Sequence, residues 1–153
     1  MLAKKSELNI VSLLIFGCNF SAIPINSEIK MPIIDNIDLD IDFNILTNKS
    51  DKSRFKIILS ITGNNAQVKL PGYFFSIMSE GVFKIDGIDS MKKEQIDGFL
   101  KLSALPILIN HIRSYLINIS SYYPYGKYVL PAVDLTDLLN SKSKLMLKKQ
   151  SKK

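Results

Sequence analysis

Residues 38–45 read Asp-Leu-Asp-Ile-Asp-Phe-Asn-Ile, an unbroken alternation of polar and apolar side chains. Successive side chains of an extended strand point to opposite faces, so this stretch predicts a strand with carboxylates and an amide on one face and apolar groups on the other. The polar face suits water, whereas the apolar face needs a second layer to cover it. The chain is therefore constrained to a layered fold built on a sheet.

Three further stretches are typical of strands, namely residues 8–20, 54–62 and about 68–85. The first contains Gly17, where we expect a kink, and it ends before Pro24. Turn-forming residues fill 48–52 and 63–65, between the later strands. Because consecutive strands are joined by short turns, the sequence predicts an antiparallel meander of four strands.

The second layer is predicted from the C-terminal part of the chain. Residues 105–121 carry apolar side chains at three- and four-residue steps, at Leu105, Leu108, Ile109, Ile112, Leu116 and Ile119. Pro106 is tolerated in the first turn of such a helix, and Asp134 is placed to cap a last helix. Residues 87–103 are too irregular to assign. The predicted fold class is α+β, a four-stranded antiparallel sheet with two C-terminal helices packed on it.

The net charge of +6 resides at the C-terminus. No acidic residue follows Asp137, and six lysines do: Lys142, Lys144, Lys148, Lys149, Lys152 and Lys153. The rest of the chain is neutral. We therefore expect a single domain over residues 1–140 and a basic, flexible tail over residues 141–153. Without a phosphate-cradling glycine loop or an aromatic RNA-binding motif, the charge does not predict a nucleic-acid partner.

The residues that most enzymes require are scarce. Cys18 is the only cysteine and His111 the only histidine, which excludes an intramolecular disulfide and a Cys/His zinc site. Glycine motifs for ATP or dinucleotides are missing. The carboxylates of Asp35, Asp38, Asp40 and Asp42 are typical of a solvated strand face rather than of a cation site. We expect no enzymatic activity, no cofactor and no metal.

The N-terminus allows two interpretations. Lys4 and Lys5, the apolar residues 10–16 and the Gly-Cys pair that ends at Cys18 are similar to a bacterial lipoprotein signal. Glu7 and Asn9 interrupt the segment, however, the uninterrupted apolar run is short, and bulky Phe16 lies where such a signal has small residues. These features favour a buried strand. No stretch approaches the ~20 apolar residues that span a bilayer. A lone thiol suits the reducing cytoplasm, where we expect the protein.

Several motifs along the chain resemble those of one known family. Residues 81–88 read Gly-Val-Phe-Lys-Ile-Asp-Gly-Ile and resemble the signature at the end of the fourth strand in the SecB family of export chaperones. Residues 130–138, Leu-Pro-Ala-Val-Asp-Leu-Thr-Asp-Leu, are similar to the start of the second SecB helix, with the proline displaced by one. Residues 108–109 with Arg113, the strand at 38–43 and residues 20–22 before the proline add to the resemblance. It covers about residues 8–139.

The resemblance implies a homotetramer, a dimer of dimers, that works as an ATP-independent holdase. Its clients would be unfolded or partly folded polypeptides, passed on to the SecA motor. SecB proteins bind SecA through acidic residues, and here Gly17, Ser21 and Ser76 occupy those places. The sequence therefore argues against SecA binding. SecB-like paralogues that protect the antitoxin of a toxin–antitoxin module are the alternative role, and a surface lipoprotein or another binding module are the remaining ones.

A client groove would use apolar faces of the first two strands and of the last helix. The candidate groove residues are Leu13, Ile15, Leu39, Ile41, Phe43, Leu135, Leu138 and Leu139. For each of them taken alone, a place in the core or in an oligomer contact is the competing interpretation. An unpaired strand edge is a further way to bind a client backbone.

Overall fold

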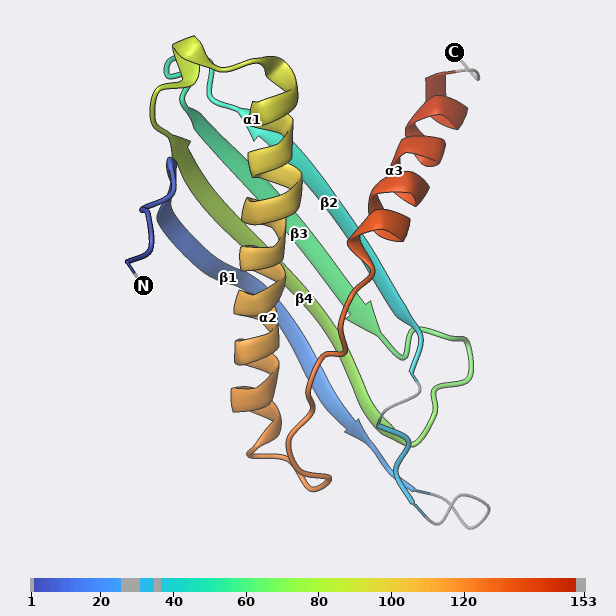
Figure 1. Ribbon diagram of the computed structural model, residues 1–153. Helices are drawn as coiled ribbons and strands as arrows, with labels where there is room; N and C mark the ends of the chain where they lie inside the picture. The colour runs from blue at the N-terminus through green and yellow to red at the C-terminus, as the bar shows by residue number, and fades with distance from the viewer. Residues whose placement is uncertain (1, 26–30, 35–36, 151–153) are drawn as a thin grey trace.

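The protein has two layers, a four-stranded antiparallel sheet and a helical layer that crosses one of its faces (Figure 1). The computed structural model describes residues 2–25, 31–34 and 37–150. The strands are β1 (Leu8–Ile23), β2 (Leu39–Thr47), β3 (Arg54–Gly63) and β4 (Gly72–Ile85). The helices are the short 3₁₀ turn η1 (Ile88–Ser90), α1 (Lys93–Phe99), the π-helical segment η2 (Leu100–Ala104), α2 (Leu105–Ser120) and α3 (Leu135–Gln150). The α+β class predicted from sequence is confirmed.

The strand order is β1-β4-β3-β2, so the predicted meander is wrong for β1. Strands β2, β3 and β4 do follow one another across the sheet. Strand β1 instead pairs with β4, from Leu8 opposite Ile85 to Ile23 opposite Gly72. The connection between β1 and β2 is long enough to pass from one edge of the sheet to the other, which a tight turn could not do. Strands β1 and β2 are therefore the two edges.

Strand boundaries depart from the prediction at two places. Strand β4 begins at Gly72, not near residue 68, because the side chain of Asn64 holds the preceding loop. Its Nδ2 donates to the carbonyl oxygens of Leu70 (2.8 Å) and Tyr73 (3.0 Å), and its Oδ1 accepts from Leu70 N (2.9 Å). In β1 the register shifts between Ile10 and Ser12 and again between Ile15 and Gly17, so irregularity is present at the predicted kink.

The long helix begins twelve residues before the predicted start. Lys92 N donates to Gln95 Oε1 (2.9 Å) at the start of α1, and the helix then continues through η2 into α2. Pro106 consequently lies inside a helical rod instead of in its first turn. Proline has no N–H for the carbonyl four residues earlier. The π-helical segment just before it shifts the hydrogen bonding, and Leu105 N donates to the oxygen of Leu100, five residues back.

The core lies between α2 and the inner face of the sheet. Alternate residues of β3 and β4 are fully buried there, and so are the facing residues of α2: Ile57, Leu59, Ile61, Phe75, Ile77, Phe83, Ile85, Leu105, Leu108, Ile112 and Leu116. A Cβ atom at Gly81 would come within 2.6 Å of the Phe83 ring and 3.2 Å of Leu108. The glycine of the 81–88 motif thus lets α2 pack closely on β4.

Helix α3 is attached to the body by polar contacts along the segment that precedes it. Tyr73 Oη donates to Gly126 O (2.8 Å), and Arg113 donates to the carbonyl oxygens of Leu130 (2.8 Å) and Pro131 (3.0 Å). Asp134 Oδ1 accepts from the N–H of residue 137 (3.0 Å), which confirms the predicted cap. The helix runs past the expected domain end at residue 140 to residue 150, and residues 151–153 lie outside the described part. The predicted flexibility of the tail stays a prediction.

Candidate functional site

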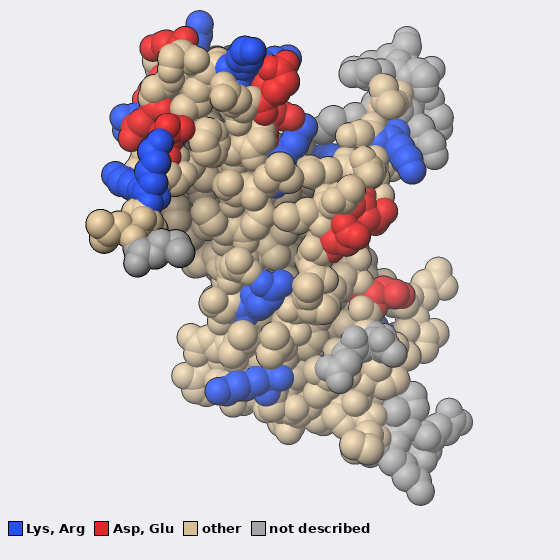
Figure 2. Space-filling model, in the orientation of Figure 1, with Lys and Arg blue, Asp and Glu red and all other residues tan. Residues whose placement is uncertain are grey.

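A groove of about 730 Å³ opens on the inner side of the sheet, between β2, the segment from η1 to η2, and α3. The space-filling view shows the surface hollowed between the α1 end of the molecule and α3 (Figure 2). Seven of its fifteen lining residues have apolar side chains: Phe43, Ile45, Phe55, Ile88, Ile96, Leu100 and Leu139. A concave, mainly apolar surface with a few polar groups is the usual form of a binding site.

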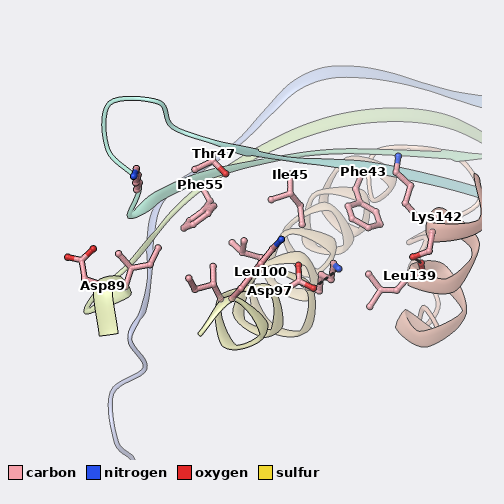
Figure 3. Close-up of a pocket in the computed structure, with 15 residues that line it drawn as sticks. Phe43, Ile45, Thr47, Phe55, Asp89, Asp97, Leu100, Leu139 and Lys142 are labelled. Atoms are coloured by element: carbon pink, nitrogen blue, oxygen red, sulfur yellow. Dashed lines mark hydrogen bonds and ion pairs between the residues drawn. The ribbon is translucent and has the colours of Figure 1, made fainter. Parts of the chain in front are cut away.

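The groove exists because α2 does not cover the whole sheet. Helix α2 packs against β4, β1 and β3, and the inner face of the edge strand β2 extends beyond it. Phe43 and Ile45 point from β2 into this space, toward Leu100 of η2 on the opposite wall (Figure 3). Both are on the inner face, since they pair with the buried Leu59 and Ile57 of β3. The alternation of β2 thus supplies one wall.

Helix α3 closes one end of the groove with Leu139 and Lys142 (Figure 3). The side chain of Lys142 is only 16% exposed. Its Nζ lies 2.5 Å from Asp42 Oδ1 and 5.5 Å from the centroid of the Phe43 ring. Asp42 and Phe43 are on opposite faces of β2, so Lys142 reaches across the free edge of that strand. The ammonium group therefore lies over the ring of Phe43 on the groove side and is paired with the carboxylate of Asp42 on the outer face.

Charged side chains form the rim of the groove. Lys52, Lys93 and Lys101 contribute ammonium groups in addition to Lys142, and Asp89 and Asp97 contribute carboxylates. Lys101 Nζ is 2.6 Å from the Asp97 carboxylate, a pair one helical turn apart. The groove therefore has an apolar floor, and its rim carries more positive than negative charge.

The structure brings some of the predicted groove residues to this place. Phe43 and Leu139 line the groove directly. Leu39 and Ile41 continue the same face of β2 beyond it, opposite Gly63 and Ile61, and both are half-buried against the core. Leu138 is also half-buried against the core. The second strand and the last helix are thus adjacent, and the client-binding role of these residues stays a prediction.

Other predicted groove residues lie elsewhere. Leu13 and Ile15 are on β1, opposite Gly81 and Ser79 of β4, and two strands, β4 and β3, separate β1 from β2. They are half-buried against the core. Leu135 lines a separate small depression with Ile109 and Arg113 of α2. Strands β1 and β2 are the opposite edges of the sheet, so Leu13 and Ile15 lie apart from this groove.

Sequence reasoning missed the wall that comes from residues 87–103. Ile88, Ile96 and Leu100 line the groove, but the charges of this segment and Gly98 obscure the apolar pattern in the sequence. A signal was present. Ile96 and Leu100 are four residues apart and continue the apolar steps of α2 toward the N-terminus. Allowing the helix to continue through Pro106 would have revealed it.

Gly17, Ser21 and Ser76 share the outer face of the sheet. Ser76 of β4 is opposite Asn19, and Gly17 and Ser21 are opposite Met78 and Phe74, which alternate with the inner-facing residues. Ser76 Oγ is 3.2 Å from Thr62 Oγ1 of β3. These three positions carry hydroxyl groups and a glycine and no carboxylate.

The polar face of β2 is turned away from the core. Asp40 and Asp42 are exposed and are opposite Thr62 and Ser60 of β3. Charged side chains on an edge strand oppose sheet-to-sheet aggregation. Over residues 2–25, 31–34 and 37–150, His, Cys, Asp and Glu form no group that could hold a metal ion, and Asp35 lies outside these ranges. In the same ranges no helix has the length and apolarity to cross a membrane.

A comparison with solved structures matches the chain to a SecB-like chaperone from Mycobacterium tuberculosis, in complex with a ChAD peptide from an antitoxin. The TM-score is 0.60 at 12% sequence identity, and the match covers 83% of this chain and 91% of that chain. The fold is SecB-like. A protein from Streptococcus agalactiae matches at a TM-score of 0.36 and 11% identity, over 85% of this chain and 100% of that one, which is too weak to carry an argument.

No family model and no curated protein matches the chain. Two of the sequence motifs lie at connections between elements of this fold. Residues 81–88 end β4 and turn into η1, with Gly87 at a φ of 71° that favours glycine. Residues 130–138 lead into α3, and Arg113 fixes their start. The motifs thus mark the two connections that position the walls of the groove.

Proposed function

We propose that the protein is an ATP-independent holdase chaperone that binds non-native polypeptides, such as preproteins, and keeps them soluble and competent for translocation. The observation that carries this proposal is the open apolar groove beside β2, in a fold that a peptide-binding chaperone shares. Covering each 100 Å² of a client's apolar surface contributes about 2.5 kcal/mol before the cost of ordering the chain. Release then follows from competition and needs no nucleotide, so the protein acts without catalysing a reaction.

A second role is supported by one observation. The chaperone of similar fold was solved with a peptide from an antitoxin. The alternative is therefore a dedicated chaperone that protects the antitoxin of a toxin–antitoxin module. The outer-face positions Gly17, Ser21 and Ser76 support it, because without carboxylates there the SecA motor has little to bind. We expect no measurable affinity for the zinc-binding tail of SecA at physiological salt.

The proposal includes a homotetramer, a dimer of dimers. Strand β1 is an open edge of the sheet, and it exposes the apolar side chains Ile10, Val11, Leu14 and Phe16. An exposed edge with apolar residues is stabilised when a second sheet covers or extends it. Light scattering on the purified protein tests this. A monomer at micromolar concentration would remove the tetramer from the proposal.

The proposal also places the protein in the cytoplasm, where newly made polypeptides are unfolded and where the exposed thiol of Cys18 stays reduced. It gives the protein no nucleic-acid partner and no membrane-inserted part. Mass spectrometry of the protein isolated from cells distinguishes it from a lipoprotein. An acylated Cys18 would contradict the cytoplasmic holdase.

The function is tested by removing apolar groups from two walls of the groove. Ile45→Ser with Leu139→Ser should weaken binding of an unfolded client about tenfold or more, because two half-buried anchors are lost. The matched control is Leu46→Ser with Leu145→Ser, on the same strand and helix but 48% and 56% exposed, and outside the groove. Suppression of client aggregation and anisotropy of a labelled peptide are the readouts. Equal binding by both folded variants would move the client site elsewhere.

A further inference from the structure

The charges around the groove are unequal. Four lysines but only two aspartates line it, and these aspartates are Asp89 and Asp97. The lysines come from four different places: Lys52 from the β2–β3 turn, Lys93 from α1, Lys101 from η2 and Lys142 from α3. Positive charge therefore lies on every side of the apolar floor. It does not arise from a single basic helix.

Two of these lysines are already paired. Lys101 is bonded to Asp97 across one turn, and Lys142 is bonded to Asp42 at the edge of β2. Their charges are largely neutralised before any ligand binds. They fix the geometry of the rim and add little net field.

Lys52 and Lys93 are different. Both are exposed, and neither forms an ion pair with any described residue, although both line the groove. They approach it from the turn between β2 and β3 and from the start of α1. Two ammonium groups without an ion pair thus line the groove together with Ile45 and Ile96, against one carboxylate without an ion pair among the described residues, that of Asp89, so the unpaired charge of the groove is positive.

We propose that the groove selects polypeptide segments in which apolar residues are flanked by aspartate or glutamate. This inference rests on the proposed function and specifies its client class. Apolar side chains of the client would cover the floor, while flanking carboxylates would pair with Lys52 and Lys93. Cationic flanks would be repelled by the same two groups. Since the lysines are exposed, the preference is screened by salt over about 8 Å at physiological ionic strength.

The test uses three labelled synthetic peptides with one shared apolar core and flanks of glutamate, serine or lysine. Affinity is measured by fluorescence anisotropy at low and high salt. At low salt the glutamate-flanked peptide should bind about tenfold more tightly than the lysine-flanked one, and the serine-flanked peptide should lie between them. At high salt the three affinities should converge. Equal affinities at low salt would overturn the charge selection and leave the holdase intact, whereas no binding by any peptide would count against the holdase itself.

The site is assigned by charge reversal. Lys52→Glu with Lys93→Glu should invert the order of the glutamate- and lysine-flanked peptides. The control is Lys4→Glu with Lys127→Glu, which makes the same change of net charge at exposed positions away from the groove. An equal inversion by the control would show that net charge, and not the rim, decides. A single-stranded oligonucleotide that competes with the peptide and depends on Lys52 and Lys93 would show a general polyanion site and overturn the proposal.

Discussion

Lys142 of α3 and Asp42 of β2 form an ion pair at 2.5 Å, although they are 100 residues apart in the sequence. The pair crosses the free edge of the sheet and places the lysine stem against Phe43. Together with Leu139, which also lines the groove, it forms the end wall that α3 contributes. An edge strand and a C-terminal helix are thus in contact at this end of the groove.

Lys142→Met removes the ammonium group and keeps an unbranched apolar side chain. We expect this variant to loosen the attachment of α3 to β2. The Asp42 side chain is 60% exposed, so the loss should be only about 0.5–1 kcal/mol in free energy of unfolding. A double-mutant cycle with Asp42→Asn isolates the pair, and hydrogen exchange of the α3 amides reports the loosening. Lys144→Met, on the exposed side of the same helix, is the control. Unchanged α3 protection in Lys142→Met would mean that the leucines alone hold the helix.

The cap of α3 gives a second prediction. Asp134→Ala removes the side-chain oxygen that accepts from the N–H of residue 137, and it should destabilise α3 by about 1 kcal/mol. Asp134→Ser should restore most of the loss. Faster amide exchange confined to α3 is the expected readout, and client binding should weaken in proportion. Faster exchange in β2 and β3 to the same extent would show that α3 unfolds only with the whole domain.

Two glycines give opposite predictions. A Cβ at Gly63 would lie 2.4 Å from the ring of the fully buried Phe75, whereas a Cβ at Gly98 meets nothing within 4 Å. Gly63→Ala should therefore destabilise by about 1–3 kcal/mol through overpacking. Gly98→Ala, in α1, should stabilise by about 0.5–1 kcal/mol because alanine favours the helix. Urea denaturation measures both, and a neutral Gly63→Ala would mean that the Phe75 ring moves freely aside.

Tyr73 gives a pH-dependent prediction. Burial raises the pKa of Tyr73 above 10.0, although the hydrogen bond from Tyr125 N lowers it in part. Above about pH 10 the unfolded chain loses this phenolic proton before the native protein does, so the native state binds more protons. The free energy of unfolding should therefore fall as the pH rises past 10.

The variant Tyr73→Phe should lack this component of the alkaline decline. At neutral pH it should cost about 1–3 kcal/mol, because Gly126 O loses a donor and Tyr125 N loses an acceptor. Tyr122→Phe, at an 84% exposed position, is the control. A hydrogen bond with Cys18 raises the pKa of Tyr115, so Tyr115 also lowers the free energy of unfolding at alkaline pH. This contribution is the same in the parent and in both variants. A decline as steep in Tyr73→Phe as in the parent would contradict the assignment.

Some parts of the candidate site could be predicted from single residues, and others could not. The alternation around Phe43 placed that side chain on an inner face, and the apolar step at Leu139 placed it on the inner side of a helix. Ile96 and Leu100 escape the sequence prediction because Pro106 favours a helix start at that position and so hides the helix before it. The π-helical segment before Pro106 makes the continuous rod possible, and its shifted hydrogen bonding leaves no simple sequence signature.

The sequence by itself determined the four strands, the two long C-terminal helices and the buried faces of these elements. The period of side-chain direction is a local property of strand and helix geometry, so the alternation at 38–45 and the steps along 105–119 needed no knowledge of neighbours. Tertiary structure alone decided that β1 pairs with β4, that β1 and β2 lie at opposite edges, and that Lys142 meets Asp42. Any two strands with an apolar face can pair, so the local pattern does not specify the neighbour of a strand. The strand order depends on how the connecting segments pass across the sheet.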